Sequence, residues 1–188
     1  MSKTPQIPLL PETPDIMKAR SRWHFTGDRK PDFAATKAPG QESVWDYPRP
    51  PALVPCSARL TVYVGEQLIA DTQRGARVLE TAGAPTYYFP ADDVDHTQIE
   101  FAELTSLCEW KGMAQSITVA GYANAAWRYV KMFPAFAELY KWLSFYPGKL
   151  DCFVDQEKAH PQPGGYYGGW VTDAIAGPIK GTPGSQSW

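Results

Sequence analysis

The sequence lacks the features that would place it in several well-defined classes of protein. Its three cysteines are widely spaced and none stands in a C-x-x-C pair, which argues against a structural zinc site and a disulfide framework. No apolar run is long enough to span a bilayer, and the first residues lack the apolar core of a signal peptide. We therefore expect a cytoplasmic protein with no membrane partner.

Strong charge and nucleotide-binding motifs are also missing. A net charge of -2 creates no field that favours nucleic acid, so no nucleic-acid partner is expected. Neither G-x-x-x-x-G-K-[ST] nor G-x-G-x-x-G occurs. Asp93 and Asp95 form a D-x-D pattern that would suit Mg²⁺, but this signal is weak, and a capped turn after Pro90 is the preferred explanation. The sequence predicts no metal and no cofactor.

Proline, glycine and aromatic residues are abundant and point to a mainly β protein. The chain has 18 prolines, 15 glycines, 7 tryptophans and 10 tyrosines, which favours strands, turns and extended segments over helices. We expect an extended N-terminal arm over 1–41, a single β domain over 42–155 and a wrapping C-terminal tail over 156–188. The tail is too rich in aromatic residues for a linker, so it is expected to pack on the domain.

Alternating apolar residues and turn signals predict the strands. Gly65 and Glu66 suit a two-residue hairpin turn, and Pro134 suits the first position of one short helix over 134–142. In the segment 42–51, the sequence P-R-P-P stiffens the backbone around Arg49. The predicted strands are 60–64, 67–70, 76–80, 86–89, 114–120, 122–129, 142–146 and 150–154.

Polar and aromatic residues in and around the stretch 77–111 are the candidates for a binding pocket. Glu80 lies on a mostly apolar strand face, and burying an unpaired carboxylate is costly, so it needs a partner such as Arg49, Lys111 or a tyrosine hydroxyl. Trp45 is a further candidate for an aromatic cage. The predicted ligand-binding residues are Arg49, Glu80, Tyr88, Cys108, Trp110, Lys111, Trp127 and Tyr146.

Three classes of function remain open on these residues. The first is a module that binds a small polar or anionic metabolite of unknown identity. The second is an enzyme of unknown reaction, with Glu80 as acid or base, Lys111 as electrostatic stabiliser and Cys108 or Tyr88 as the reactive group. In that case Lys111 would activate the Cys108 thiol, although a buried, inert cysteine is the simpler interpretation. The third is an interaction domain whose arms complete a homodimer.

A series of short motifs resembles one bacterial family. The motifs are E-S-V-W-D-Y-P-R-P-P, A-D-T, V-L-E-T, P-T-Y-Y-F-P-A-D-D-V, C-E-W-K-G and F-Y-P, in that order over about residues 42–155. Together they resemble the domain-of-unknown-function 427 family, which is sometimes labelled nucleotidyltransferase-like. The resemblance implies a compact β-tent (Mss4-like) fold of antiparallel sheets. It also implies motif positions at Arg49, Glu80, Tyr88, Cys108, Lys111, Gly112 and Tyr146.

Overall fold

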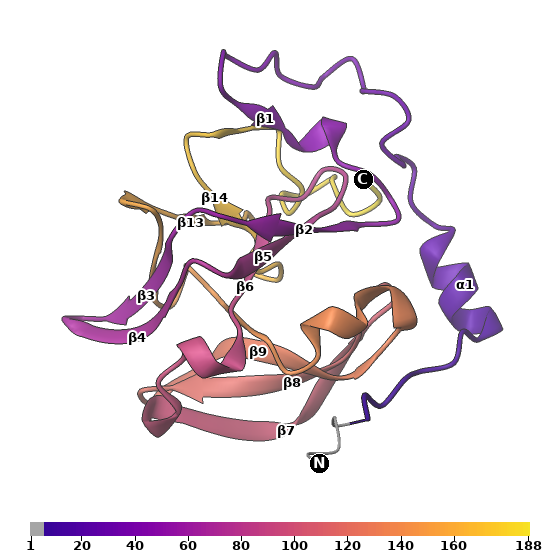
Figure 1. The fold of residues 1–188 in the computed structure, drawn as a ribbon. Coiled ribbons are helices and arrows are strands. Elements are labelled where there is room, and N and C mark those ends of the chain that lie inside the picture. Colours follow the sequence, from indigo (N-terminus) through magenta and orange to yellow (C-terminus); the bar gives the residue numbers. More distant parts are fainter. Residues whose placement is uncertain (1–5) are drawn as a thin grey trace.

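The protein is mainly β and is built from several small sheets. The computed structural model describes residues 6–188, with only the backbone for residues 104 and 105, so the first five residues of the predicted arm lie outside the description. Strands make up 40% and helices 12% of the structure. The sheets are antiparallel apart from one short parallel pair (Figure 1). The predicted mainly β class is confirmed.

The longest strands form a four-stranded antiparallel sheet in the order β10-β9-β8-β7. The turn between β8 and β9 uses Ala120 and Gly121, which both adopt positive φ. The strands predicted over 114–120 and 122–129 correspond to β8 and β9. No strand was predicted for the edge strand β7. The bounds are Ile99–Cys108 (β7), Gly112–Val119 (β8), Tyr122–Met132 (β9) and Leu143–Phe145 (β10).

A second four-stranded sheet has the order β12-β11-β3-β4 and contains the predicted hairpin. Gly65 has a φ of +59° at the first turn position, which a side chain would disfavour. The outer strand β12 comes from the C-terminal tail. The bounds are Leu60–Val64 (β3), Gln67–Thr72 (β4), Asp151–Val154 (β11) and Glu157–Lys158 (β12).

The third sheet carries the strands that lead to Glu80 and Tyr88. Its order is β2-β5-β6, with bounds Ala52–Cys56 (β2), Gly75–Leu79 (β5) and Thr86–Tyr88 (β6). Two short pairs add the terminal segments to the molecule. They are the parallel pair of Glu42–Ser43 (β1) with Ile175–Ala176 (β15), and the antiparallel pair of His160–Pro161 (β13) with Trp170–Val171 (β14).

The helical segments differ from the expectation. The α-helix α1, Pro14–Arg20, lies in the N-terminal arm, where Thr13 caps it and Pro14 begins it. The segment predicted as a helix over 134–142 is a kinked 3-10 segment, because Phe136 leaves helical geometry and its side chain is buried. The 3-10 segments are Val44–Asp46 (η1), Ala91–Asp93 (η2), His96–Gln98 (η3) and Pro134–Leu139 (η4).

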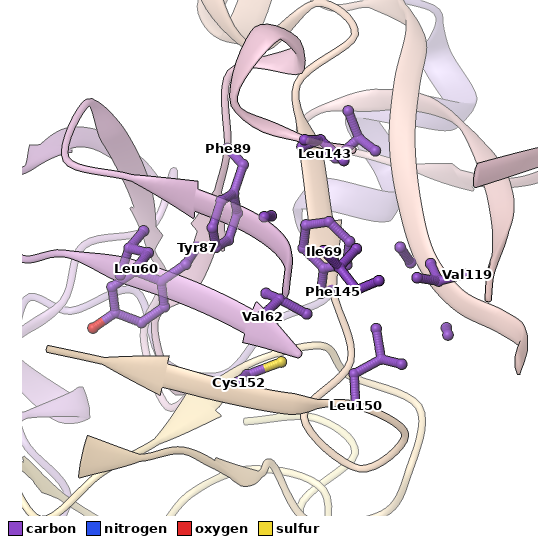
Figure 2. Packing of buried hydrophobic residues seen from close by; sticks show 14 of the residues in the cluster. Leu60, Val62, Ile69, Tyr87, Phe89, Val119, Leu143, Phe145, Leu150 and Cys152 are labelled. Atoms are coloured by element: carbon purple, nitrogen blue, oxygen red, sulfur yellow. The ribbon is translucent and has the colours of Figure 1, made fainter. Parts of the chain in front are cut away.

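The main hydrophobic core lies between the sheets and includes part of the tail. Leu60 and Val62 of β3 and Cys152 of β11 are fully buried and pack with Phe89 and Phe145 (Figure 2). Trp170 of β14 also belongs to this cluster. Its indole nitrogen donates a hydrogen bond to the carbonyl oxygen of Phe145 at 2.9 Å. The C-terminal tail therefore contributes to the hydrophobic core as well as covering the domain.

The turn between β7 and β8 depends on a glycine. Gly112 has a φ of +132°, and a methyl group there would overlap the carbonyl oxygen of Lys131. We expect Gly112→Ala to lower the free energy of unfolding by about 2 kcal/mol or more, from backbone strain and this overlap. Urea denaturation measures the effect. Gly121→Ala is the control, because Gly121 also has positive φ but has no atom within 4 Å of the added group.

Equal losses for Gly112→Ala and Gly121→Ala would contradict the close approach between β8 and β9 at this turn. The control is expected to lose about 1 kcal/mol from its left-handed backbone alone.

Candidate functional site

A cavity of about 680 Å³ lies at the meeting point of three parts of the structure, which form its walls. These parts are strands β5 and β6, one face of the β7-β8-β9 sheet, and the two terminal segments. All eight residues predicted from the sequence line it: Arg49, Glu80, Tyr88, Cys108, Trp110, Lys111, Trp127 and Tyr146. Their convergence on one cavity is a feature of the structure, and their role in binding a ligand stays a prediction.

Arg49 is the structural anchor of the cavity. Its side chain is 2% exposed, and its Nε donates to Glu80 Oε1 at 3.2 Å. The two terminal guanidinium nitrogens donate to the carbonyl oxygens of Phe25, at 2.7 Å, and Thr81, at 2.9 Å. Burial lowers the pKa of Arg49, while the nearby Glu80 carboxylate opposes this effect. The predicted partner for Glu80 is thus present, and the arm that contains Phe25 is tied to the β domain.

Lys111 brings a buried positive charge to the cavity. It lies in the β7–β8 turn and is 9% exposed. The described residues offer its Nζ neither a hydrogen-bond acceptor nor an ion-pair partner. Burial opposes the charge, but the acidic groups around Lys111, which are Cys108 and Tyr88 as they ionise and the carboxylates of Glu80 and Glu109, raise its pKa above the ordinary value. Lys111 is therefore a cation in the cavity wall whose Nζ has no hydrogen-bond acceptor among the described residues.

The aromatic wall contains two unpartnered polar groups. The hydroxyl of Tyr88 and the indole nitrogen of Trp110 are buried, and neither has a hydrogen-bond partner among the described residues. Burial raises the pKa of Tyr88 to about 12, so its hydroxyl stays protonated and can donate. Trp127 and Tyr146 form the rest of this wall, with ring centroids 4.5 Å apart. Unpaired buried donors are costly, so a bound acceptor here would be stabilised.

The terminal segments supply residues that sequence reasoning missed. Trp23 donates through its indole nitrogen to Glu109 Oε1 at 3.2 Å. The Nζ of Lys180 lies 3.4 Å from the centre of the Trp23 ring, and the guanidinium carbon of Arg49 lies 4.6 Å from it. The aromatic content of both arms predicted that they dock, but no sequence signal indicated where.

A glycine lets the tail pass over the aromatic wall. At Gly168 a Cβ would overlap the ring of Trp127, so only glycine allows the backbone to lie this close. The neighbouring Tyr166 and Tyr167 line the same cavity, and their rings meet edge to face at 5.1 Å. The segment from 165 to 168 therefore forms the outer wall.

Trp45 does not belong to the aromatic cage, so that expectation is wrong. Its ring packs with Phe25, Phe33 and Trp188 in a separate cluster, where it is 1% exposed. Its indole nitrogen donates to the carbonyl oxygen of Pro178 at 3.1 Å. The 3-10 segment Val44–Asp46 turns the ring away from the cavity and toward the terminal segments.

The two D-x-D carboxylates take part in local turns and in an ion pair. Asp93 accepts from the Thr72 hydroxyl at 2.6 Å and pairs with Arg74. Asp95 caps the 3-10 segment His96–Gln98 by accepting from the Thr97 backbone. Within the part of the chain that the structure describes, no three His, Cys, Asp or Glu residues come together as metal ligands. The same part contains no helix that is long and apolar enough to cross a membrane.

Fold and cavity define a small β protein with one large, mixed polar and aromatic site. Residues 52–156 match the family model described as Domain of unknown function (DUF427). Because this match covers more than half of the chain, the protein belongs to the DUF427 family. A search of curated proteins found no match. Arg49, Trp23, Tyr167 and Lys180 lie outside the matched residues, so the cavity combines the family domain with its flanking segments.

Proposed function

We propose that the protein binds a small anionic metabolite with a planar portion in this cavity. The observation that carries the proposal is the Lys111 ammonium, which is buried at the cavity and has no acceptor among the described residues. A buried charge is stable only when it is paired, and an anionic ligand would pair it. The unpartnered donors of Tyr88 and Trp110 would add hydrogen bonds to the same ligand.

The charges around the cavity support an anion. Five basic side chains line it against two carboxylates, in a protein whose net charge is -2. Arg49 pairs with Glu80, and Arg22 lies 3.9 Å from Glu109. Lys111, Lys149 and Lys180 have no carboxylate within ion-pair distance among the described residues. The local field therefore differs in sign from the net charge of the molecule.

The aromatic wall and the cavity volume support a ligand of metabolite size. Trp127 and Tyr146 present adjacent rings, and Tyr88 meets Trp127 edge to face with centroids 6.4 Å apart. Such a wall suits stacking against a planar group. A volume of about 680 Å³ is in the range of small-molecule sites.

We further propose that the sheets form a β-tent. The β10-β9-β8-β7 sheet and the β2-β5-β6 sheet meet at Phe89, which follows β6 directly. Phe89 exchanges two backbone hydrogen bonds with Leu143 of β10. Two sheets that join along one line and diverge from it leave a space between their inner faces. The cavity lies on this side, since both Tyr88 and Trp127 line it.

Thermal shift against a panel of anionic metabolites tests the function. We expect at least one anion to raise the melting temperature of the wild type, and Lys111→Met to weaken its binding about tenfold or more, through loss of a desolvated ion pair. Lys131→Met is the matched control, because Lys131 is exposed on β9 and outside the cavity. It should bind as the wild type does.

The same panel distinguishes a binding module from an enzyme. Glu80→Gln with binding retained and no turnover in any assay supports the module. Turnover that Glu80→Gln abolishes while binding persists would support an enzyme that uses Glu80, Lys111 and Cys108. If Lys111→Met and Lys131→Met bind every anion equally well, the assignment of the cavity is wrong.

A further inference from the structure

Lys180 is an amine held at the cavity by aromatic rings. The residue is 4% exposed, and its Nζ lies 3.4 Å from the centre of the Trp23 ring and 4.9 Å from that of Tyr167. Its backbone is fixed on both sides of the Cα atom: the N–H donates to the carbonyl oxygen of Ala82, and the carbonyl oxygen accepts from the side-chain amide of Gln162. The described residues supply no hydrogen-bond acceptor for Nζ, so its position comes from packing.

Burial makes Lys180 easier to deprotonate than an exposed lysine, although the Trp23 ring 3.4 Å from its Nζ favours the charged form. Burial lowers its pKa to about 8, and the positive charge of Arg49 acts in the same direction. The carboxylates of Glu80 and Glu109 oppose this effect only in part. A desolvated lysine beside another cation is a chemically activated nucleophile. Lys111 and Lys180 thus differ, because the first keeps its charge and the second loses its proton readily.

We propose that Lys180 forms an imine with the carbonyl group of an aldehyde or α-oxo acid bound in the cavity. The neutral amine adds to the carbonyl carbon to give a carbinolamine. The carbinolamine loses water to form the C=N bond, so one amine and one carbonyl are converted to one imine and one water, with no change in oxidation state. This inference rests on the proposed function, because the ligand occupies the same cavity.

The neighbouring groups suit both ends of such a ligand. Lys111 is the unpaired cation available to the ligand's acidic group, and it lines the cavity with Lys180. Loss of water requires a proton at the departing oxygen, and the Tyr167 hydroxyl is the candidate donor beside Lys180. The titratable groups that face Nζ are Glu80 after β5, Glu109 in the β7–β8 turn, Arg22 in the N-terminal arm, Arg49 and Tyr167.

Reductive trapping tests the proposal. The intact protein is incubated with glyoxylate, pyruvate, 2-oxoglutarate or pyridoxal 5′-phosphate and cyanoborohydride, and labelled lysines are mapped by peptide mass spectrometry. We expect at least one probe to label Lys180 about tenfold or more over the exposed Lys131, since each unit of lowered pKa raises the neutral fraction about tenfold. The rate should rise with pH and level off above about 8.

Variants and a second measurement separate this proposal from the function on which it rests. Lys180→Arg keeps a cation over Trp23 but cannot form the imine, so labelling at the cavity should disappear while calorimetry still detects binding of glycolate or another anion that lacks the carbonyl. If such anions or the probes bind and no probe labels Lys180 more than Lys131, the imine is wrong and the binding function stands. If no anion binds and Lys180 stays unlabelled, both are wrong.

Discussion

Replacing Trp170 with alanine is expected to lower the free energy of unfolding by about 3–5 kcal/mol, the usual cost of truncating a fully buried tryptophan. The Trp170 ring is 0% exposed and lies 5.0 Å from that of Tyr87 and 6.0 Å from that of Phe89. The substitution would leave a cavity among these rings. It would also leave the Phe145 carbonyl oxygen without the indole donor, at a further cost.

Urea denaturation followed by circular dichroism measures the loss for Trp170→Ala. The matched control is Tyr166→Ala, which removes an aromatic ring from the same tail at a position that is 76% exposed. A change within about 0.5 kcal/mol is expected there. Similar, small losses in both variants would mean that the tail lies on the domain without contributing to its core.

A tail that supplies core residues also fixes the geometry of the cavity. Trp170 is anchored in the core ten residues before Lys180, whose own backbone is held by Ala82 and Gln162. Gly168 passes directly over Trp127 just before Trp170, and Gln162 accepts from the Ala84 backbone on the other side. The position of Lys180 over Trp23 is thus a consequence of core packing many residues earlier in the chain.

The strands were predictable wherever apolar alternation and turn residues agreed. The hairpin of β3 and β4 has both, and so do β8 and β9 with Gly121 between them. The edge strand β7 was missed because its outer side faces solvent, with Phe101 43% and Leu107 53% exposed, and the stretch was interpreted from its functional residues. The short alternation of Ile99, Glu100 and Phe101 was the available signal.

The candidate site was predictable in its β-domain half and not in its flanking half. Glu80, Tyr88 and Lys111 lie close in sequence around strands that pair in register, so local patterns place them together. Trp23 and Lys180 reach the cavity through the docking of two long segments with few regular hydrogen bonds. Sequence patterns report local geometry, and they carried no information on which surface those segments cover. The placement of Trp45 in the cage failed for the same reason.

Arg49→Ala is expected to lower the free energy of unfolding by about 3–5 kcal/mol, the cost of breaking a buried ion pair from one side. The variant leaves the Glu80 carboxylate without its guanidinium, and the carbonyl oxygens of Phe25 and Thr81 without their donors. It also removes the cation stacked 4.6 Å from the centre of the Trp23 ring. We therefore expect the N-terminal arm to detach at this point before the β domain unfolds.

Hydrogen exchange distinguishes detachment of the N-terminal arm from unfolding of the β domain. In Arg49→Ala the amides from 23 to 26 should lose protection under conditions in which β8 and β9 keep theirs. Arg22→Ala is the control, because its side chain is 63% exposed and its distance to Glu109 is 3.9 Å, so a loss of at most about 1 kcal/mol is expected. Glu80→Gln in the Arg49→Ala background should recover part of the stability, because the neutral amide removes the unpaired charge. A double variant no more stable than Arg49→Ala would instead assign the loss to the two carbonyl contacts and the Trp23 stacking. Arg49 would then act mainly by attaching the N-terminal arm, which carries one wall of the cavity, to the β domain.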